Sequence, residues 1–420
     1  MQESVAVFLL IGLFAVMIIC HLPVTFAMVI ATATTMLYLN IPMMTMVQQM
    51  AKSVNSFSLL AIPFFILMGE IMGAGGISDR LLKFANVLVG RFRGGLAFVN
   101  VLASMFFGGI SGSAVADVSS LGKIEIPMME DAGYDKDFSI CVTVSSACQG
   151  LLIPPSHNMV LYAMTAGGVS VGKLFLAGYA PGILLGVALM ALCYIFAIKR
   201  NYPKGDPVSF KEALVITKDA VFAIGAMFII VGGVVAGLFT ATEAAAIGCI
   251  YCLLVATLVY RQLSLKDMGR ILYNTVKTLA MIYSLIAAAG AFAWMMAYLR
   301  IPAKFTGILM DVSDNKIVVL LLINVLLLLL GCIMDMAPLI LIMTPILLPV
   351  VQKFGMDPVQ FGIMLIANLA IGLLTPPVGS CLYAGCAVGG AKIEKVTKCM
   401  LPFYLTMVIV LLMITFIPAL

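Results

Sequence analysis

Charged side chains are scarce in this sequence. Asp, Glu, Lys and Arg together make up 10% of the 420 residues, whereas hydrophobic residues make up 63%. A soluble domain has about a quarter of its residues charged, so the composition excludes a soluble enzyme with a single membrane anchor. Apolar runs of about 20 residues, enough to cross a hydrocarbon core of about 30 Å, recur along the whole chain.

Sequence features of several other protein classes are also missing. The chain has no GxxxxGK[ST] motif, so we predict no nucleotide site. Its Lys and Arg residues lie in short loops rather than in one patch, which gives no reason to expect a nucleic-acid partner. The start, MQES, has no basic region and no cleavage site after it. We therefore expect the run from Val5 onward to be a retained span.

Ten apolar segments are long and continuous enough to cross the bilayer. We place them at about 5–20, 23–39, 57–74, 138–166, 175–198, 219–239, 241–260, 271–299, 359–388 and 400–419. Two further segments, 96–122 and 316–348, are interrupted near the middle by Gly and polar residues, and we predict that they are re-entrant hairpins. With both termini in the periplasm, seventeen basic residues lie in cytoplasmic loops and six in periplasmic ones, as the positive-inside rule requires. We therefore expect an all-α, polytopic protein of the bacterial inner membrane.

An internal repeat runs through the chain with an offset of 222 residues. Gly109 matches Gly331, and IPMMEDAGYD (126–135) and GLLIPP (150–155) match LPVVQKFGMD (348–357) and GLLTPP (372–377). Because the two hairpins begin on opposite sides of the membrane, we predict inverted repeats with two broken helices, an arrangement typical of secondary transporters. We expect four regions: N-terminal scaffold spans (1–75), the first repeat (76–198), central scaffold spans (199–300) and the second repeat (301–420).

Four stretches interrupt the helical pattern, at 108–117, 149–158, 331–338 and 372–380. Backbone that leaves a helix inside a bilayer must find partners in protein, water or a ligand. Paired Pro residues leave carbonyl groups of the preceding turn unpaired, and carbonyl and hydroxyl oxygens suit a small hard cation. The N-termini of the half-helices favour an anion. One site could thus hold a cation together with an anionic solute.

Individual polar residues at these breaks have two possible roles. Ser111 and Ser113 could contact the solute or the cation, although Ser113 could also cap the returning helix. Asp335 is the only acid between Ile317 and Val351; an acid at that depth indicates function, and its alternative role is a helix N-cap. Thr375 precedes a Pro pair and could be a cation ligand, a helix cap or both.

The first repeat carries further polar candidates. Ser156 and Asn158 follow the first Pro pair and could contact a solute, and His157 lies between them. Asp117 comes one turn after the first hairpin tip and could act as a gate on the cytoplasmic side. Glu70 lies within an apolar span, where an interhelical hydrogen bond is the expected role.

Several motifs resemble one transporter family along the whole chain. They are SFSLLAIPFFILMGEIM (56–72), SGSAVAD (111–117), LLIPPS (151–156), MTPILLPVVQKFGMDPVQFGIMLIANLAIGLLTPPVG (343–379) and the last span. The chain resembles the large membrane subunit of tripartite ATP-independent periplasmic (TRAP) transporters. This resemblance implies a scaffold and a mobile transport domain that moves as an elevator, coupled to a sodium gradient. It also implies a small four-span membrane subunit, a periplasmic substrate-binding protein and an organic-acid substrate such as a C4-dicarboxylate, a sialic acid or another sugar or keto acid.

The resemblance also implies site residues. One sodium site would fall at Ser111, Gly112, Ser113, Gly150 and Pro154, and another at Gly331, Gly372, Thr375 and Val378. The substrate would lie between the hairpin tips, near Ser111, Ser113, Ser156, Asn158, Asp335 and Ser380. The chain departs from the family where His157 and Asn158 replace the usual Ile-Pro, which leaves the substrate open.

Two other functions are compatible with parts of the sequence. Gly109–Ile110–Ser111–Gly112 reads as the GxSG of a serine hydrolase with His157 as its base, which would make the chain an intramembrane protease. That hypothesis leaves the second repeat unexplained, and we expect no enzyme activity. A proton-coupled carboxylate symporter without a binding protein keeps the same fold and is the closer alternative.

Overall fold

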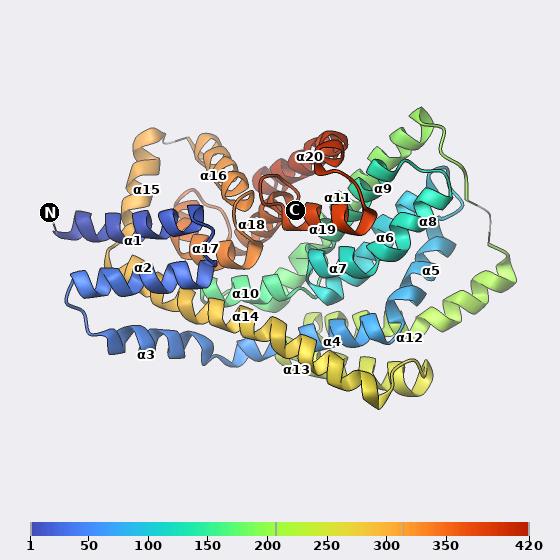
Figure 1. The fold of residues 1–420 in the computed structure, drawn as a ribbon, viewed down its shortest axis with the longest axis horizontal. Helices are drawn as coiled ribbons and strands as arrows, with labels where there is room; N and C mark the ends of the chain where they lie inside the picture. The colour runs from blue at the N-terminus through green and yellow to red at the C-terminus, as the bar shows by residue number, and fades with distance from the viewer. Residues whose placement is uncertain (1, 206–207, 314, 419–420) are drawn as a thin grey trace.

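The computed structural model describes residues 2–205, 208–313 and 315–418, and the regular elements of this part are helices (Figure 1). An isolated backbone bridge between Arg93 and Lys204 is the exception in the described ranges. The side chains of residues 109–111 lie outside the described part.

The N-terminal helices are apolar and are separated by short breaks. They are α1 (Gln2–Ile19), α2 (Val24–Tyr38), α3 (Met43–Val54), the 3₁₀ turn η1 (Phe57–Leu60), α4 (Ala61–Ala74) and α5 (Ile77–Val89). Pro23 and Pro42 directly precede α2 and α3, where a missing N–H removes no helical hydrogen bond. Gly76 has a φ of 68°, and α4 and α5 are bent by 72° at this point.

The first repeat consists of a hairpin and a broken helix. Hairpin 1 runs through α6 (Gly95–Ser111), α7 (Ala114–Ser120) and α8 (Gly122–Asp131), and its tip is at Gly112 and Ser113. The broken helix is α9 (Lys136–Gly150) followed by α10 (His157–Ala166), and α11 (Val171–Lys199) completes the repeat.

The central helices connect the two repeats. They are α12 (Phe210–Val235), α13 (Ala241–Leu254) with the π-helical turn η2 (Val255–Val259), the long α14 (Leu265–Tyr298) and α15 (Ile301–Val312). A capping box begins α13, where Thr240 and Glu243 exchange hydrogen bonds, each satisfying a backbone N–H at the helix start.

The second repeat has the same order of elements. Hairpin 2 is α16 (Lys316–Gly331) and α17 (Met336–Lys353), and the broken helix is α18 (Pro358–Gly372) followed by α19 (Ser380–Gly389); α20 (Ile393–Phe416) ends the repeat. In Figure 1 the helices of hairpin 2 lie to the left of the centre and those of hairpin 1 to the right, so the two tips approach each other from opposite sides.

The structure corrects two boundaries and adds helices to the predicted pattern. Hairpin 1 extends to Asp131 rather than to 122, because α8 is less apolar than a span and continues past Pro127. The short helices α3, α5 and α15 were not predicted as crossings. α3 and α5 each carry an apolar side and a polar side, so neither gives the continuous apolar run by which a crossing is recognised.

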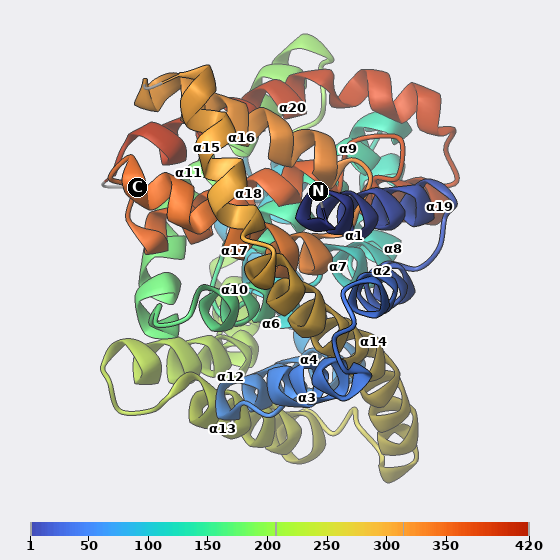
Figure 2. The ribbon, with the colours of Figure 1, turned by 90° about the vertical axis from the view of Figure 1, so that its left-hand side faces the viewer.

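Two interrupted helices form the centre of the molecule. In α9 every residue from Phe138 to Gly150 is buried, and in α18 every residue from Phe361 to Gly372 is buried. Figure 2 shows α3, α12 and α13 in a lower layer, whereas α16, α18 and α20 lie in the upper part. The long helix α14 contacts α2, α3, α4 and α17, and so borders both layers.

Six helices of the described part are long and apolar enough to cross a bilayer alone, and the bent pair α4–α5 makes a seventh candidate. Shorter apolar helices, among them α1, α2 and α18, coincide with other predicted crossings. The total of ten crossings therefore stays a prediction.

Candidate functional site

Each hairpin packs against a broken helix through a pair of glycines. A Cβ built on Gly108 would lie 2.6 Å from the Cα of Gly150, and one built on Gly372 would lie 2.6 Å from the Cα of Gly331. Only glycine permits this approach of two backbones. The partner of Gly331 in the repeat is therefore Gly108 by contact, and the sequence match with Gly109 was one residue off.

The breaks of α9 and α18 have the same hydrogen bonds. The backbone N–H of Ile153 donates to the carbonyl of Gly150 at 3.0 Å, and that of Thr375 donates to the carbonyl of Gly372 at 2.9 Å. Both pairs obey the 222-residue offset. The Pro154–Pro155 and Pro376–Pro377 peptide bonds that follow are both cis. The repeat found in the sequence therefore extends to backbone geometry.

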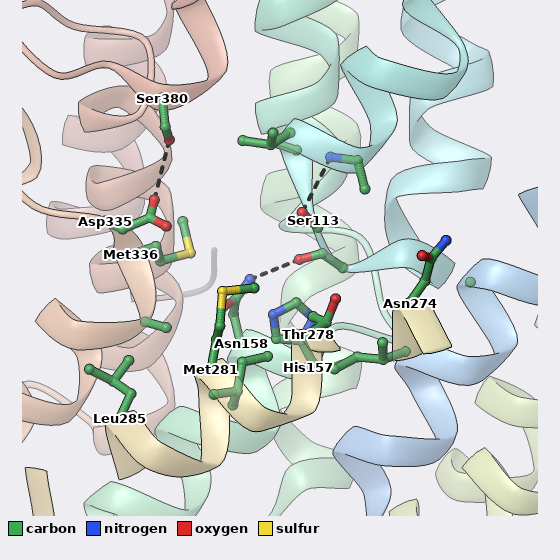
Figure 3. A pocket seen from close by; sticks show the side chains of 18 of the residues that line it. Ser113, His157, Asn158, Asn274, Thr278, Met281, Leu285, Asp335, Met336 and Ser380 are labelled. Carbon is green, nitrogen blue, oxygen red and sulfur yellow. Dashed lines mark hydrogen bonds between the residues drawn. The ribbon is translucent and has the colours of Figure 1, made fainter. Parts of the chain in front are cut away.

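Equivalent residues also connect the broken helices to the hairpin tips. Asn158 Nδ2 donates to the carbonyl of Gly112 at 3.0 Å. Its counterpart at the 222-residue offset, Ser380, donates through Oγ to Oδ1 of Asp335 at 3.3 Å. We call these two contacts the tip contacts (Figure 3). They place both predicted solute-contacting positions at the tips, with an amide in the first repeat and a hydroxyl in the second.

Ser113 and Asp335 each begin a returning helix. The Ser113 side chain accepts a hydrogen bond from the N–H of Ala116 at 3.3 Å, so its expected capping role is confirmed. Asp335 occupies the N-cap position of α17 but makes no side-chain cap bond. Its carboxyl group instead receives the hydroxyl of Ser380, which is the role that the N-cap alternative did not predict.

A cavity of about 1250 Å³ lies between the tips and the helices α4 and α14. On the side of the repeats it is lined by Gly112, Ser113, His157, Asn158, Asp335 and Ser380. Figure 3 shows Asp335 and Ser380 on one side of this space and Ser113, His157 and Asn158 on the other. Of the six residues predicted to contact the solute, Ser113, Asn158, Asp335 and Ser380 are thus brought to one cavity.

The opposite wall was not predicted from the sequence. One face of α14 lines the cavity with Asn274, Thr278, Met281 and Leu285 (Figure 3), a spacing of three to four residues that marks one side of a helix. Asn274 Nδ2 donates to Oε2 of Glu70 at 3.2 Å, which confirms the interhelical hydrogen bond expected for Glu70. Two polar residues at helical spacing within an apolar span were the signal available in the sequence.

Other predicted site residues lie away from the cavity surface. The side chain of Ser111 lies outside the described residues. Ser156 is fully buried and does not line the cavity. Asp117 is also buried and away from the cavity lining, so its position does not suit an exposed gate. Thr375 donates its hydroxyl to the carbonyl of Ile371 at 2.8 Å and does not cap α19, whose N-cap is Gly379.

The oxygens at the breaks fit a small hard cation. Among the described residues no cluster of three His, Cys, Asp or Glu side chains could hold a metal ion, so a transition-metal centre is not indicated. The carbonyls of Gly112, Pro154 and Gly372 each accept one hydrogen bond, from Asn158, Tyr179 and Thr375 respectively. A carbonyl oxygen has two lone pairs, so each can accept a second partner.

The fold and the cavity define a class of membrane protein. Two hairpins and two interrupted helices around a central cavity form a secondary transporter. The chain is similar in fold to the solved YdaH transporter of Alcanivorax borkumensis, with a TM-score of 0.64 and 16% identity over 89% of this chain and 88% of that one. Residues 11–420 match the model of the DctM component of tripartite ATP-independent periplasmic transporters. The chain belongs to this family, which confirms the resemblance and the multi-span helical fold.

Relatives with assigned names support the same family. The chain is 42% identical to the Salmonella typhimurium protein YgiK, over 99% of this chain and 96% of that protein. It is 39% identical to the sialic acid TRAP transporter large permease SiaM of Vibrio cholerae, over 88% and 87%. It is also 39% identical to the isethionate TRAP transporter permease DctMQ of Oleidesulfovibrio alaskensis, where it covers 98% of this chain and spans 65% of that protein. A transporter permease is not an enzyme, so the protease hypothesis was wrong.

Proposed function

We propose that this chain is the large membrane subunit of a sodium-coupled TRAP transporter that imports an organic acid. The observation that carries this proposal is the pair of tip contacts beside one cavity, made by equivalent residues of two repeats. Named relatives act on isethionate and on sialic acid, which are both organic acids, and we extend that substrate class to this chain.

The proposed sodium sites use the oxygens of the two breaks. One comprises Ser111, Gly112, Ser113, Gly150 and Pro154; the other comprises Gly331, Gly372, Thr375 and Val378. The contacts between Gly331 and Gly372, and between the N–H of Val378 and the carbonyl of Cys332 at 3.0 Å, support the second set. Bound sodium would supply positive charge beside the tips, and the chain's own carbonyls and hydroxyls would fix its position.

The proposed substrate site is the cavity between the tips. The acid group of the substrate would bind near Asn158 and the N-terminus of α10, because helix N-termini favour anions. Ser113, Asp335 and Ser380 would contact the rest of the molecule, and Ser111 and Ser156 stay candidates from the sequence.

We further propose that the two repeats, 76–198 and 301–420, move as a transport domain against a scaffold formed by regions 1–75 and 199–300. The cavity supports this division, because α4 and α14 form one wall and the tips form the other. Moving the tips along α14 would expose the cavity to alternate sides of the membrane, as in an elevator.

Two protein partners belong to this proposal. A small four-span subunit would bind the large one in the membrane, and a periplasmic substrate-binding protein would deliver the acid. The printed name DctMQ of a longer relative supports the small subunit, because it joins two components in one chain. The proposed location is the bacterial inner membrane, with both termini in the periplasm.

Thermal unfolding in sodium and in potassium salts of equal ionic strength tests the cation sites. A cation that binds only the folded state at 100 times its dissociation constant stabilises by about 2.7 kcal/mol. We expect sodium alone to stabilise the protein and Thr375→Ala to weaken this effect. The matched control is Thr217→Ala, which removes the same hydroxyl-to-carbonyl bond in α12, away from the site. Equal unfolding temperatures in the two salts would contradict sodium binding in the absence of substrate.

A cysteine cross-link between α14 and a hairpin tip tests the movement. The pair Thr278→Cys and Ser113→Cys faces the same cavity. Oxidation should stop sodium-driven uptake of isethionate or sialic acid in vesicles that also contain the small subunit and binding protein, and reduction should restore it. Uptake that continues in the fully cross-linked protein would refute the elevator movement.

A further inference from the structure

A second acidic position lies inside hairpin 1, apart from the cavity. Glu125 on α8 has none of its surface exposed, and it does not line the cavity. Neither of its carboxyl oxygens has a hydrogen-bond partner within the described ranges. An ionised carboxylate in such surroundings is costly, because burial of an unpaired charge removes its hydration without replacing it.

The helices that pack against α8 offer no positive charge to compensate. These are α6, α7, α9 and α19. Their sequences contain no Lys, Arg or His except Lys136 at the start of α9, and Lys136 lies 3.9 Å from Glu130 at the surface. The titratable groups that these helices bring are Asp117 on α7, Cys141 and Cys148 on α9, and Cys381 and Cys386 on α19. Asp117 is close enough for its charge to repel that of Glu125.

The nearest polar side chains are already engaged with one another. Asn100 donates to Thr143 at 2.7 Å and lies 3.9 Å from the sulfur of Met129, one turn beyond Glu125. Ser146 donates to Asn100 at 2.6 Å. These donors satisfy each other, so none of them is free to stabilise a carboxylate on α8.

The second repeat shows that the fold does not require an acid at this place. The residue 222 positions after Glu125 is Leu347, which is also fully buried, in α17. A leucine therefore fills the equivalent position of hairpin 2 by packing alone. The carboxyl group of Glu125 adds a chemical property that the packing of the hairpin does not need.

We propose that Glu125 is a proton-binding site inside hairpin 1 and stays protonated in the folded protein at neutral pH. A proton is the ligand that fits, because it neutralises the carboxyl group without requiring the several oxygen ligands that a metal ion needs. If hairpin 1 moves as the proposed function requires, the proton travels with it; that consequence rests on the proposed function, whereas the proton site does not.

The pH dependence of unfolding tests the site without knowledge of the substrate. A free glutamate loses its proton near pH 4.3, so unfolding at neutral pH would release the proton of Glu125. Stability then falls as pH rises, by about tenfold in the folding equilibrium constant per pH unit for one proton. We expect the unfolding temperature of the wild type to fall between about pH 5.5 and about pH 8.5, and Glu125→Gln to flatten this slope. Glu130→Gln, on the same helix, is the matched control and should keep the wild-type slope.

A second measurement covers the case in which Glu125→Gln fails to fold. Infrared spectra of wild-type protein labelled with ¹³C-glutamate report protonated glutamates separately from Asp117. A protonated-glutamate band at about pH 7.5, above the titration of a free glutamate, supports the proposal. Its absence overturns the proposal, as would parallel pH slopes in the wild type and Glu125→Gln.

Sodium separates this proposal from the proposed function. Stabilisation of the wild type by sodium should persist in Glu125→Gln, because the cation sites lie at the breaks. Loss of that stabilisation in Glu125→Gln, together with no pH slope in the wild type, would mean that Glu125 holds a metal cation and would overturn the proton site. Absence of a sodium effect in the wild type would refute the coupling ion and leave the pH test of Glu125 intact.

Discussion

The glycine contact between hairpin 2 and the second broken helix gives a quantitative prediction for Gly372→Ala. The added methyl group would lie 2.6 Å from Cα, 2.7 Å from C and 2.9 Å from O of Gly331. All three are backbone atoms and cannot rotate away, so α16 and α18 must separate. Overpacking of this kind costs about 1–3 kcal/mol. Alanine recovers up to about 1 kcal/mol relative to glycine in a helix, which leaves a net loss of about 1–2 kcal/mol.

Two other glycines calibrate this value. A Cβ on Gly331 would meet Gly372 at 3.1 Å, so Gly331→Ala should destabilise less than Gly372→Ala. A Cβ on Gly232 in α12 meets nothing within 4 Å, so Gly232→Ala should be neutral or stabilising by up to about 1 kcal/mol. The expected order of stability is Gly232→Ala, then Gly331→Ala, then Gly372→Ala.

Thermal unfolding of the purified variants in detergent, with and without sodium, provides the assay. Because the carbonyl of Gly372 belongs to the proposed second sodium site, Gly372→Ala should also reduce the stabilisation by sodium, while Gly232→Ala should leave it unchanged. If Gly372→Ala unfolded at the same temperature as Gly232→Ala, the close packing of the two breaks would be refuted.

Three further predictions concern other parts of the molecule. Asn158→Ala should cost about 1 kcal/mol and speed hydrogen exchange at the tip of hairpin 1, because Gly112 loses its amide donor. Hydrogen bonds from Tyr202 and Arg200 lower the pKa of Asp135 in the loop before α9; the stability they add is present above the ordinary pKa and lost as pH falls through the lowered one, so Asp135→Asn should flatten acid unfolding curves. Gly76→Ala forces a Cβ onto a φ of 68° and should lower the unfolding temperature by a cost of about 1–2 kcal/mol.

The sequence predicts best where the two repeats constrain the same backbone. The Pro pairs after Gly150 and Gly372 identified both broken helices, because proline within an apolar span interrupts a helix in any context. Gly108 was missed in favour of Gly109 because neighbouring glycines look alike in a sequence, and only the packing of α6 on α9 decides which one makes the contact.

The α14 wall of the cavity was harder to predict for a different physical reason. Asn274 and Thr278 lie in a span with no repeat counterpart in the alignment at 222 residues, and a polar residue in a span can face a neighbouring helix or a cavity. The sequence carries the helical spacing of these residues but not the direction of that helical face. The hydrogen bond from Asn274 to Glu70 depends on how α4 packs against α14, which is tertiary information.

The chemical difference between the tip contacts indicates how one cavity could separate two opposite charges. The tip of hairpin 1 contributes a carbonyl to Asn158, whereas the tip of hairpin 2 contributes the carboxyl group of Asp335 to Ser380. An anionic substrate would avoid Asp335 and favour the N-terminus of α10, which has no acid beside it in the cavity lining. A cation would favour the opposite side, since a carboxyl group attracts it. Under the proposed function, Asp335→Asn should therefore weaken the sodium effect more than the binding of the acid, and an equal loss of both would show that the two ligands share one set of contacts.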